Sequence, residues 1–178
     1  GFPVYQEVTK GGLAVAGPDG NQFEGNCWPG RSVWVDYFNP KARDYWSALI
    51  ADRYRSDWVH IWNDMNEPAV FDVPELSFPR DALHNLGNSS IGHDRVHNLY
   101  GKMMHGATRS GLLRRNPGKR PLVLSRSFYA GSQSIGPIWT GDNAATWAHL
   151  RASIPMLLSL GMAGMPWVGA DVGGFFGD

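Results

Sequence analysis

The chain has 178 residues, enough for one domain with a hydrophobic core but fewer than the ~250 residues of a complete eight-unit α/β barrel. Its 16 lysines and arginines balance its 16 aspartates and glutamates, so no bulk charge would draw it to nucleic acid or to an anionic membrane. Its single cysteine, Cys27, excludes an internal disulfide and a cysteine-rich metal site.

No segment of the sequence predicts a membrane anchor. The first residues, Gly1-Phe2-Pro3, have neither the basic start nor the apolar run of a secretory signal. The longest apolar stretch, residues 154–170, is interrupted by Pro155 and Pro166 and is shorter than the ~20 residues of a membrane-spanning helix. We expect no membrane insertion, and we interpret residues 1–178 as an internal segment of a single catalytic domain in a larger protein.

The first half of the chain predicts two regular elements between loops. Residues 1–40 are rich in glycine, proline and asparagine, which favours a long loop. A helix is predicted from Pro40, with Asn39 as its N-cap and proline at its first position. Aromatic and β-branched residues in 58–63 predict a short buried strand, and a polar loop is expected from there to about residue 92.

The second half alternates predicted helices and strands. Helical spacing of apolar residues predicts a helix over roughly 94–114, stopped by Asn116-Pro117-Gly118. Strands are predicted at 121–125, 138–140 and 165–168, with a helix over about 146–160 before the last strand. Strands that alternate with helices predict a parallel sheet and an α/β fold.

Four charged residues stand at or just past the predicted strand ends: Asp64, Arg126, Asp142 and Asp171. In a parallel α/β barrel the carboxyl ends of the strands meet at one rim, and that rim carries the active site. The pattern therefore predicts a partial (β/α)8 barrel, roughly its strands 4 to 7 with the preceding loop region.

The aspartates among these four residues suit one particular chemistry. Hydrolysis of a glycosidic bond with retention needs two carboxyl groups ~5–5.5 Å apart, one as nucleophile and one as general acid and base. Asp64 and Asp142 follow different strands and could face each other across a pocket. A chance pair of aspartates at the rim is the alternative that spacing alone leaves open.

Four sequence segments identify a family. These are Trp62-Asn63-Asp64-Met65-Asn66-Glu67, Ser125-Arg126-Ser127, Trp139-Thr140-Gly141-Asp142 and Gly169-Ala170-Asp171 with the residues up to Phe175. In these segments and in their order the chain resembles glycoside hydrolase family 31, the α-glucosidase family. The resemblance covers nearly the whole chain.

The resemblance implies a role for each matched residue. Asp64 would be the nucleophile that forms a covalent glucosyl-enzyme, and Asp142 the acid and base. Arg126 would bind substrate hydroxyls. Glu67 would belong to the catalytic centre or, alternatively, support the loop through an ion pair. Further residues would line the glucose pocket or its rim: Trp28, Trp62, Met65, Trp139, Asp171 and Phe175.

Within the family, one branch is most similar. The segments Phe23 to Gly30, His93 to Gly101 and Arg120 to Arg126 resemble the enzymes that trim α-1,3-linked glucose from N-linked glycans in the endoplasmic reticulum lumen. That resemblance implies a carbohydrate substrate, a regulatory β-subunit, no cofactor and no nucleic-acid partner. A lysosomal or secreted α-glucosidase, an α-xylosidase and a non-catalytic sugar-binding homologue are the alternatives.

A metal site is a weaker possibility. His93 and His97 are four residues apart in a predicted helix and could form a pair of metal ligands. Because no cysteine or carboxylate-rich segment accompanies them, we expect histidines with ordinary hydrogen bonds and no metal. We also expect the isolated chain to be inactive, since residues beyond it would be needed to complete the pocket.

Overall fold

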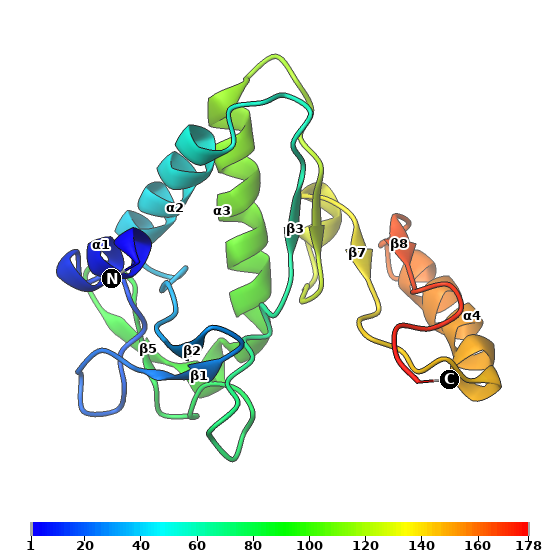
Figure 1. Ribbon diagram of the computed structural model, residues 1–178, viewed down its shortest axis with the longest axis horizontal. Helices are drawn as coiled ribbons and strands as arrows, with labels where there is room; N and C mark the ends of the chain where they lie inside the picture. Colours follow the sequence, from blue (N-terminus) through cyan, green and yellow to red (C-terminus); the bar gives the residue numbers. More distant parts are fainter. Residues whose placement is uncertain (1, 178) are drawn as a thin grey trace.

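The computed structural model describes residues 2–177, and at its centre lies a four-stranded parallel sheet. The strands follow one another in chain order: β3 (Ile61–Asn63), β6 (Val123–Ser125), β7 (Ile138–Trp139) and β8 (Val168–Gly169). Parallel neighbours in chain order form an arc of an α/β barrel that is open at β3 and at β8 (Figure 1). The expected parallel α/β sheet, as part of a barrel, is therefore confirmed.

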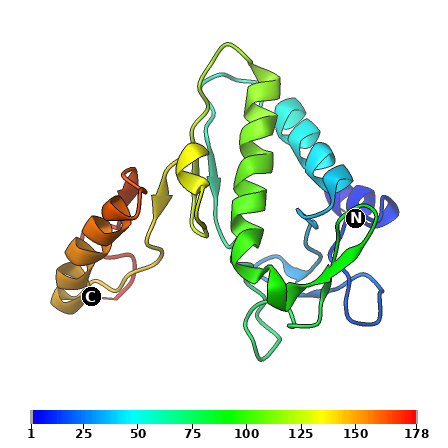
Figure 2. The same cartoon turned by 180° about the vertical axis from the view of Figure 1, so that it is seen from behind.

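Helices α2 (Pro40–Arg53) and α3 (Tyr100–Arg115) lie side by side and cover one face of the sheet beside β3 and β6 (Figure 2). The Asn39 side chain accepts a hydrogen bond from the Lys41 amide at 3.0 Å, so the predicted N-cap of α2 is present. The two helices approach closely because Gly111 of α3 has no side chain: a Cβ there would lie 2.7 Å from the Ser47 carbonyl oxygen. Ile50, Leu112 and Val123 form a small core between the helices and β6.

Helix α4 (Trp147–Met162) connects β7 to β8 and lies beside β8, away from the pair of α2 and α3 (Figure 1). It begins where the Thr146 hydroxyl accepts a hydrogen bond from the His149 amide at 3.2 Å. Large apolar side chains on it and after it are open to solvent, with Trp147 82% and Met162 92% exposed. The end of the sheet at β8 is therefore an uncovered apolar surface.

The first 40 residues contain more structure than the predicted loop. Helix α1 (Pro3–Lys10) forms there, and β1 (Gly25–Cys27) pairs with β2 (Gly30–Ser32) in an antiparallel hairpin. No side chain caps α1, so its position depends on Val8, which is buried in the main core. That packing comes from distant residues, which local sequence patterns do not reveal.

The predicted polar loop before residue 92 also contains a hairpin, formed by β4 (Leu83–Asn85) and β5 (Ser90–Gly92). Two short 3-10 helices follow, η1 (His93–Arg95) and η2 (His97–Leu99), so the predicted helix over 94–114 is regular only from Tyr100 onward. A third 3-10 helix, η3 (Ser132–Ser134), lies between β6 and β7.

The main core lies between α1, α2, α3 and the loops that join them. It is built from mainly aliphatic and aromatic side chains: Val8, Leu13, Val15, Val35, Tyr37, Phe38, Ala42, Val70, Phe78, Ala82, Val96, Tyr100 and Ala107. Because this core supports the loops that follow β2 and β3, it positions the carboxyl end of β3. Among the helices of residues 2–177, none has both the length and the apolar character to cross a membrane.

The strand predicted at 58–63 is shorter and more exposed than expected. Only Ile61–Asn63 is regular, and Trp62 is 59% exposed. Side chains of a strand alternate between its two faces, and the helices cover only the face opposite Trp62. The last strand is also shorter than predicted: β8 consists of Val168–Gly169 only, at the end of the predicted range 165–168.

Candidate active site

The charged residues follow three neighbouring strands. Asp64 comes directly after β3, Arg126 directly after β6, and Asp142 three residues after β7. Because these strands are parallel, their carboxyl ends lie at the same edge of the sheet. The predicted convergence of these three residues is present.

Arg126 is the centre of the site, and Glu67 fixes its orientation. The guanidinium Nε donates to Glu67 Oε1 at 2.7 Å, and Nη2 donates to Glu67 Oε2 at 3.1 Å. Two parallel hydrogen bonds to one carboxylate define the plane of the guanidinium. The Arg126 side chain is only 16% exposed, so surrounding residues also hold it in place.

Both aspartates contact the remaining nitrogen, Nη1. Asp64 Oδ1 lies 3.1 Å and Asp142 Oδ2 lies 3.4 Å from it. These two oxygens are therefore at most about 6.5 Å apart, the sum of the two distances. That limit is compatible with the ~5–5.5 Å spacing of a retaining pair, whereas inverting enzymes hold their carboxyl groups ~6.5–9.5 Å apart.

Arg126 keeps its charge at every pH of interest. Burial works against the charged form, but the hydrogen bonds and charge of Glu67 and the charges of Asp64 and Asp142 outweigh burial and raise the Arg126 pKa above its usual value. One fixed cation thus stands among three carboxyl groups. When all three are ionised the cluster carries a net negative charge, which suits a reaction that develops positive charge on the substrate.

Asp64 has one oxygen held and the other open. Its Oδ1 accepts from the Met65 amide at 2.9 Å as well as from Arg126. Met65 has a φ of 57°, in the left-handed region that a residue with a side chain seldom adopts. Within residues 2–177 no hydrogen bond is found to Asp64 Oδ2, so this oxygen remains available for another partner.

Asn66 joins the two loops that carry Asp64 and Arg126. Its Nδ2 donates to Ser125 Oγ at 2.9 Å, and its Oδ1 accepts from the Ser127 amide at 2.9 Å. Asn66 is buried, and so is Gly101, which lets α3 approach both loops: a Cβ on Gly101 would lie 2.4 Å from Ser127 Cβ. No role was predicted for Asn66, although its neighbours Met65 and Glu67 were both predicted to belong to the site.

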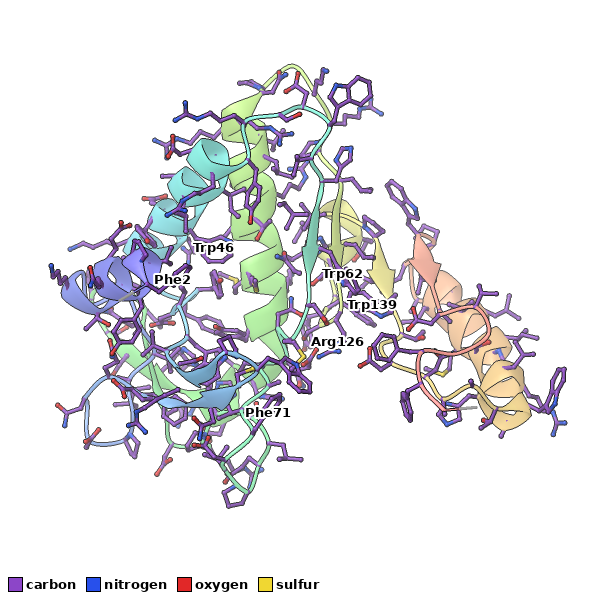
Figure 3. The ribbon with its side chains drawn as sticks, in the orientation of Figure 1. Phe2, Trp46, Trp62, Phe71, Arg126 and Trp139 are labelled. Carbon is purple, nitrogen blue, oxygen red and sulfur yellow. The ribbon has the colours of Figure 1, made fainter. Side chains whose placement is uncertain are left out.

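Two tryptophans stand beside the charged cluster (Figure 3). The rings of Trp62 and Trp139 meet edge to face, with centroids 5.4 Å apart. Trp139 is 5% exposed and supports Trp62, whose indole is mostly open. An open indole beside carboxylates is a surface on which a sugar ring can stack.

Trp28 and Phe71 form a second aromatic pair, with ring centroids 4.9 Å apart. Both are exposed, and they come from the β1–β2 hairpin and the loop after Asp64. Trp28 was predicted to line the pocket, whereas Phe71 was not singled out. Within residues 2–177 no hydrogen bond or ring contact connects either side chain to Arg126.

The last segment of the predicted site reaches the cluster through Asn143. The Asn143 side chain donates to the Asp171 carbonyl oxygen at 3.1 Å, and the Asn143 carbonyl oxygen accepts from the Phe175 amide at 2.7 Å. Asp171 and Phe175 are therefore tied to the residue next to Asp142 by backbone groups. Their side chains make no hydrogen bond or ring contact with the cluster within the described residues.

Cavities flank the charged cluster on two sides. One of about 410 Å³ is lined by Glu67, Arg126 and Asp142 together with Ser127, Phe128, Thr140 and Gly141. The other, of about 720 Å³ and mostly apolar, includes Asp64, Met65 and Cys27 in its lining. The space around the two aspartates is thus open to a ligand.

The histidines of the possible metal site bind each other. His93 Nε2 and His97 Nδ1 are 2.7 Å apart, and the other His93 nitrogen, Nδ1, is 2.9 Å from His84 Nε2. In residues 2–177 no group of three or more His, Cys, Asp or Glu side chains is arranged to hold a metal ion.

Comparison with known proteins identifies the family. Residues 1–178 match the model of the "Glycosyl hydrolases family 31 TIM-barrel domain". The chain is 49% identical over 181 residues to a "Probable glucan 1,3-alpha-glucosidase" of Oryza sativa subsp. japonica, covering 99% of this chain and 19% of that protein.

Solved structures give the same result. A glucosidase II alpha subunit in its alpha3-Glc2-bound form is 52% identical, with a TM-score of 0.92 over 99% of this chain and 19% of that one. The heterodimeric ER glucosidase II complex, containing the catalytic subunit and the binding domain of a regulatory subunit, is 53% identical, with a TM-score of 0.92 over 99% and 20%. The chain thus spans about a fifth of the length of these relatives.

Proposed function

The chain belongs to glycoside hydrolase family 31, and on that premise we propose that the protein containing it is a retaining α-glucosidase. It would release terminal non-reducing α-linked glucose through a covalent glucosyl-aspartate. The observation that carries the proposal is the contact of Asp64 and Asp142 with one nitrogen of Arg126 at the rim of the sheet. Residues 1–178 would then be a segment of one (β/α)8 catalytic domain.

Asp64 would act as the nucleophile. Arg126 and the Met65 amide hold its Oδ1, while Oδ2 would attack the anomeric carbon. The bond from the sugar to the leaving oxygen breaks as the bond to Oδ2 forms. The oxocarbenium-like transition state is positive, so the net negative cluster stabilises it.

Asp142 would be the acid in this first step and the base in the second. It donates its proton to the leaving glycosidic oxygen and then removes a proton from the water that releases glucose. The shared contact with Arg126 keeps Asp142 close to Asp64, as a pair that acts on one anomeric carbon requires.

Glu67 would position Arg126, since Arg126 occupies both of its oxygens. This favours the supporting role over direct contact with the reacting atoms. Arg126 would orient the two aspartates and bind a sugar hydroxyl. Trp62 would stack on the sugar ring with Trp139 behind it, and four residues would complete the pocket or its rim: Trp28, Met65, Asp171 and Phe175.

The natural substrate would contain α-1,3-linked glucose on an N-linked glycan. The similarity to a glucan 1,3-alpha-glucosidase and to an alpha3-Glc2-bound glucosidase II supports this choice. By the same similarity the protein would work in the endoplasmic reticulum lumen, with a regulatory subunit as partner.

Asp142→Asn tests the division of labour in the full-length protein. Substrates with poor leaving groups need a proton from Asp142, whereas aryl glucosides with good leaving groups do not. We expect kcat/KM for an α-1,3-linked disaccharide to fall at least ~10-fold more than the glucosylation rate constant with 2,4-dinitrophenyl α-glucoside, in keeping with the ~10²–10⁴-fold typical of general acid catalysis. Equal losses on both substrates would contradict the role of Asp142. Glu24→Gln, which changes a half-buried carboxylate paired with Arg31, serves as the control.

A further inference from the structure

A chain of four buried or half-buried side chains connects the core to a third cavity. Asp36 Oδ1 is 2.9 Å from His84 Nδ1, His84 Nε2 is 2.9 Å from His93 Nδ1, and His93 Nε2 is 2.7 Å from His97 Nδ1. Asp36, His84 and His93 are each at most 2% exposed. The proposed glycosidase chemistry uses none of these groups.

Hydrogen bonding assigns a direction to the first link of this chain. Asp36 also accepts from the Phe38 and Asn85 amides, at 3.1 and 2.7 Å, so its carboxylate is an acceptor and His84 Nδ1 carries the donated proton. In each of the next two bonds, between His84 Nε2 and His93 Nδ1 and between His93 Nε2 and His97 Nδ1, one nitrogen donates and the other accepts.

The last two histidines of this hydrogen-bonded chain favour their neutral forms. Burial, with the charges of His84 and His97, lowers the His93 pKa to about 3. Burial also lowers the His97 pKa, although the nearby charge of Glu67 acts in the opposite direction. His97 Nδ1 is used in the bond to His93, and within residues 2–177 no hydrogen bond is found to the other ring nitrogen, Nε2.

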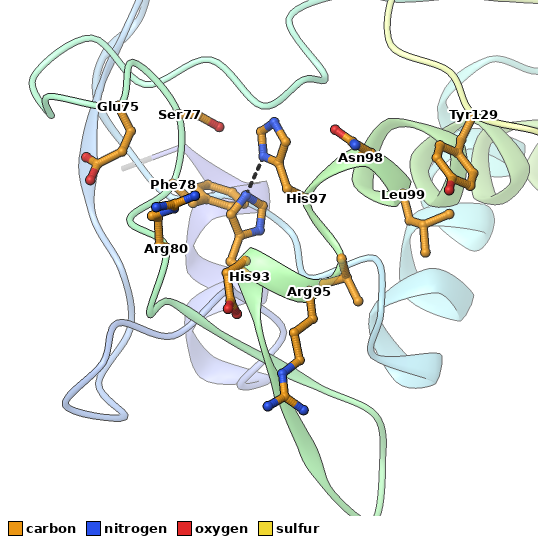
Figure 4. A pocket seen from close by; sticks show the side chains of 12 residues that line it. Glu75, Ser77, Phe78, Arg80, His93, Arg95, His97, Asn98, Leu99 and Tyr129 are labelled. Carbon is orange, nitrogen blue, oxygen red and sulfur yellow. Dashed lines mark hydrogen bonds between the residues drawn. The ribbon is translucent and has the colours of Figure 1, made fainter.

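His97 lines a cavity of about 410 Å³ whose walls are polar and apolar in about equal parts (Figure 4). Arg80, Arg95 and Asn98 contribute donors, and Tyr129 contributes an exposed ring. The Ser77 oxygen, which points toward the His97 ring, is buried and has no hydrogen-bond partner among the described residues. Polar groups left without partners at a cavity wall are suited to a ligand with several hydroxyl groups.

The cavity adjoins the proposed active site. Tyr129 follows Arg126 by three residues in the same loop, and Glu67 is near enough for its charge to act on His97. We propose that His97, oriented by Asp36 through His84 and His93, binds a hydroxyl of a further sugar unit of an oligosaccharide substrate in this cavity. The inference rests on the proposed glycosidase function, because that function places an oligosaccharide beside the cavity.

Two substitutions separate ligand binding from structural support. His97→Asn places an amide where Nδ1 lies and can keep the bond to His93, but it removes the polar atom at Nε2. His97→Gln places an amide near Nε2 and loses the bond to His93. A ligand contact therefore predicts impairment in His97→Asn and near-normal behaviour in His97→Gln, whereas a structural role predicts the reverse.

The measurement uses the full-length protein with p-nitrophenyl α-glucoside and with nigerotetraose, a chain of four α-1,3-linked glucoses. We expect His97→Asn to raise KM for the tetrasaccharide roughly 3- to 10-fold, the loss of about one hydrogen bond, with kcat and the aryl glucoside unaffected. Melting temperatures of both variants identify any folding defect. Impairment of His97→Gln instead, or equal effects on both substrates, would overturn the proposal.

A second measurement distinguishes failure of the proposed glycosidase function from failure of the proposed sugar-binding cavity. If the unaltered protein hydrolyses neither substrate, saturation-transfer NMR with nigerotetraose still tests the cavity in the unaltered protein and in His97→Asn. Contact signals that weaken in the variant would support a sugar-binding cavity, and signals of equal strength in both proteins would overturn it.

Discussion

Replacing Gly101 with alanine tests whether the approach of α3 to two loops positions the proposed active site. A Cβ at Gly101 would lie 2.4 Å from Ser127 Cβ, 2.5 Å from Ser127 Oγ and 2.8 Å from the Asn66 carbonyl oxygen. Carbon atoms in contact prefer ~3.5–4.0 Å, so the loops must move by about 1 Å. Two of the three contacts belong to Ser127, the residue after Arg126.

The expected cost has two parts with opposite signs. Overpacking a filled interior costs about 1–3 kcal/mol, and alanine in place of glycine inside a helix returns about 1 kcal/mol. We expect a net loss of about 1–2 kcal/mol of unfolding free energy. Because ~1 Å of misplacement can cost ~10²-fold in rate, kcat/KM should fall by at least ~10-fold at temperatures well below melting.

Two other glycines of α3 provide matched controls. At Gly106 the nearest atom to a Cβ is Ile135 Cδ1 at 3.8 Å, so Gly106→Ala should be neutral or stabilising, by up to ~1 kcal/mol. At Gly111 a Cβ would meet the Ser47 carbonyl oxygen at 2.7 Å and Ile50 Cβ at 2.8 Å, far from the site. Gly111→Ala should therefore destabilise the protein as Gly101→Ala does, with little change in kcat/KM.

The assay combines thermal or denaturant unfolding with steady-state kinetics on the full-length protein. The account requires Gly101→Ala to lower both stability and activity, and Gly111→Ala to lower stability alone. Normal activity in Gly101→Ala, or equal losses of activity in both variants, would refute the claim that this contact positions Arg126.

Two further predictions concern stability. The His93 pKa is lowered to about 3 in the folded state, against 6.5 for the ordinary side chain, so the unfolded state binds more protons between these values. His93 should therefore have no effect on the melting temperature above pH ~6.5, and it should lower the melting temperature as pH drops toward ~3. His93→Gln should flatten this pH dependence. An unchanged slope of melting temperature against pH in the variant would argue against a neutral buried His93. The 178-residue chain expressed alone exposes the sheet edges at β3 and β8 and apolar residues such as Trp147 and Met162, so it should aggregate, and a sharp cooperative melt from a monomer would contradict this.

Local signals were sufficient for much of the fold. The N-cap at Asn39 and the alternation of helices and strands gave α2, α4 and the parallel sheet, because caps and periodicity depend on neighbouring residues. The strand-end positions of Asp64, Arg126 and Asp142 similarly predicted their convergence, which parallel pairing enforces.

Other features depend on contacts between distant residues. Helix α1 forms where Val8 packs into the core, and the exposure of Trp62 follows from which face of the sheet the helices cover. The β4–β5 hairpin had a local signal, Gly87-Asn88, at its turn, where Gly87 has a φ of 97°. The link from Asp36 to His97 joins residues 61 positions apart, and spacing gave no indication of it.

Mechanism-based labelling tests the central claim most directly. The full-length protein would be treated with 5-fluoro-α-glucosyl fluoride, which forms the covalent intermediate faster than it is released, and the labelled peptide would be mapped by mass spectrometry. The account predicts a label on Asp64, which would demonstrate covalent catalysis with glucose in the pocket. A label on Asp142, or no label in protein shown to be folded, would contradict the proposed roles.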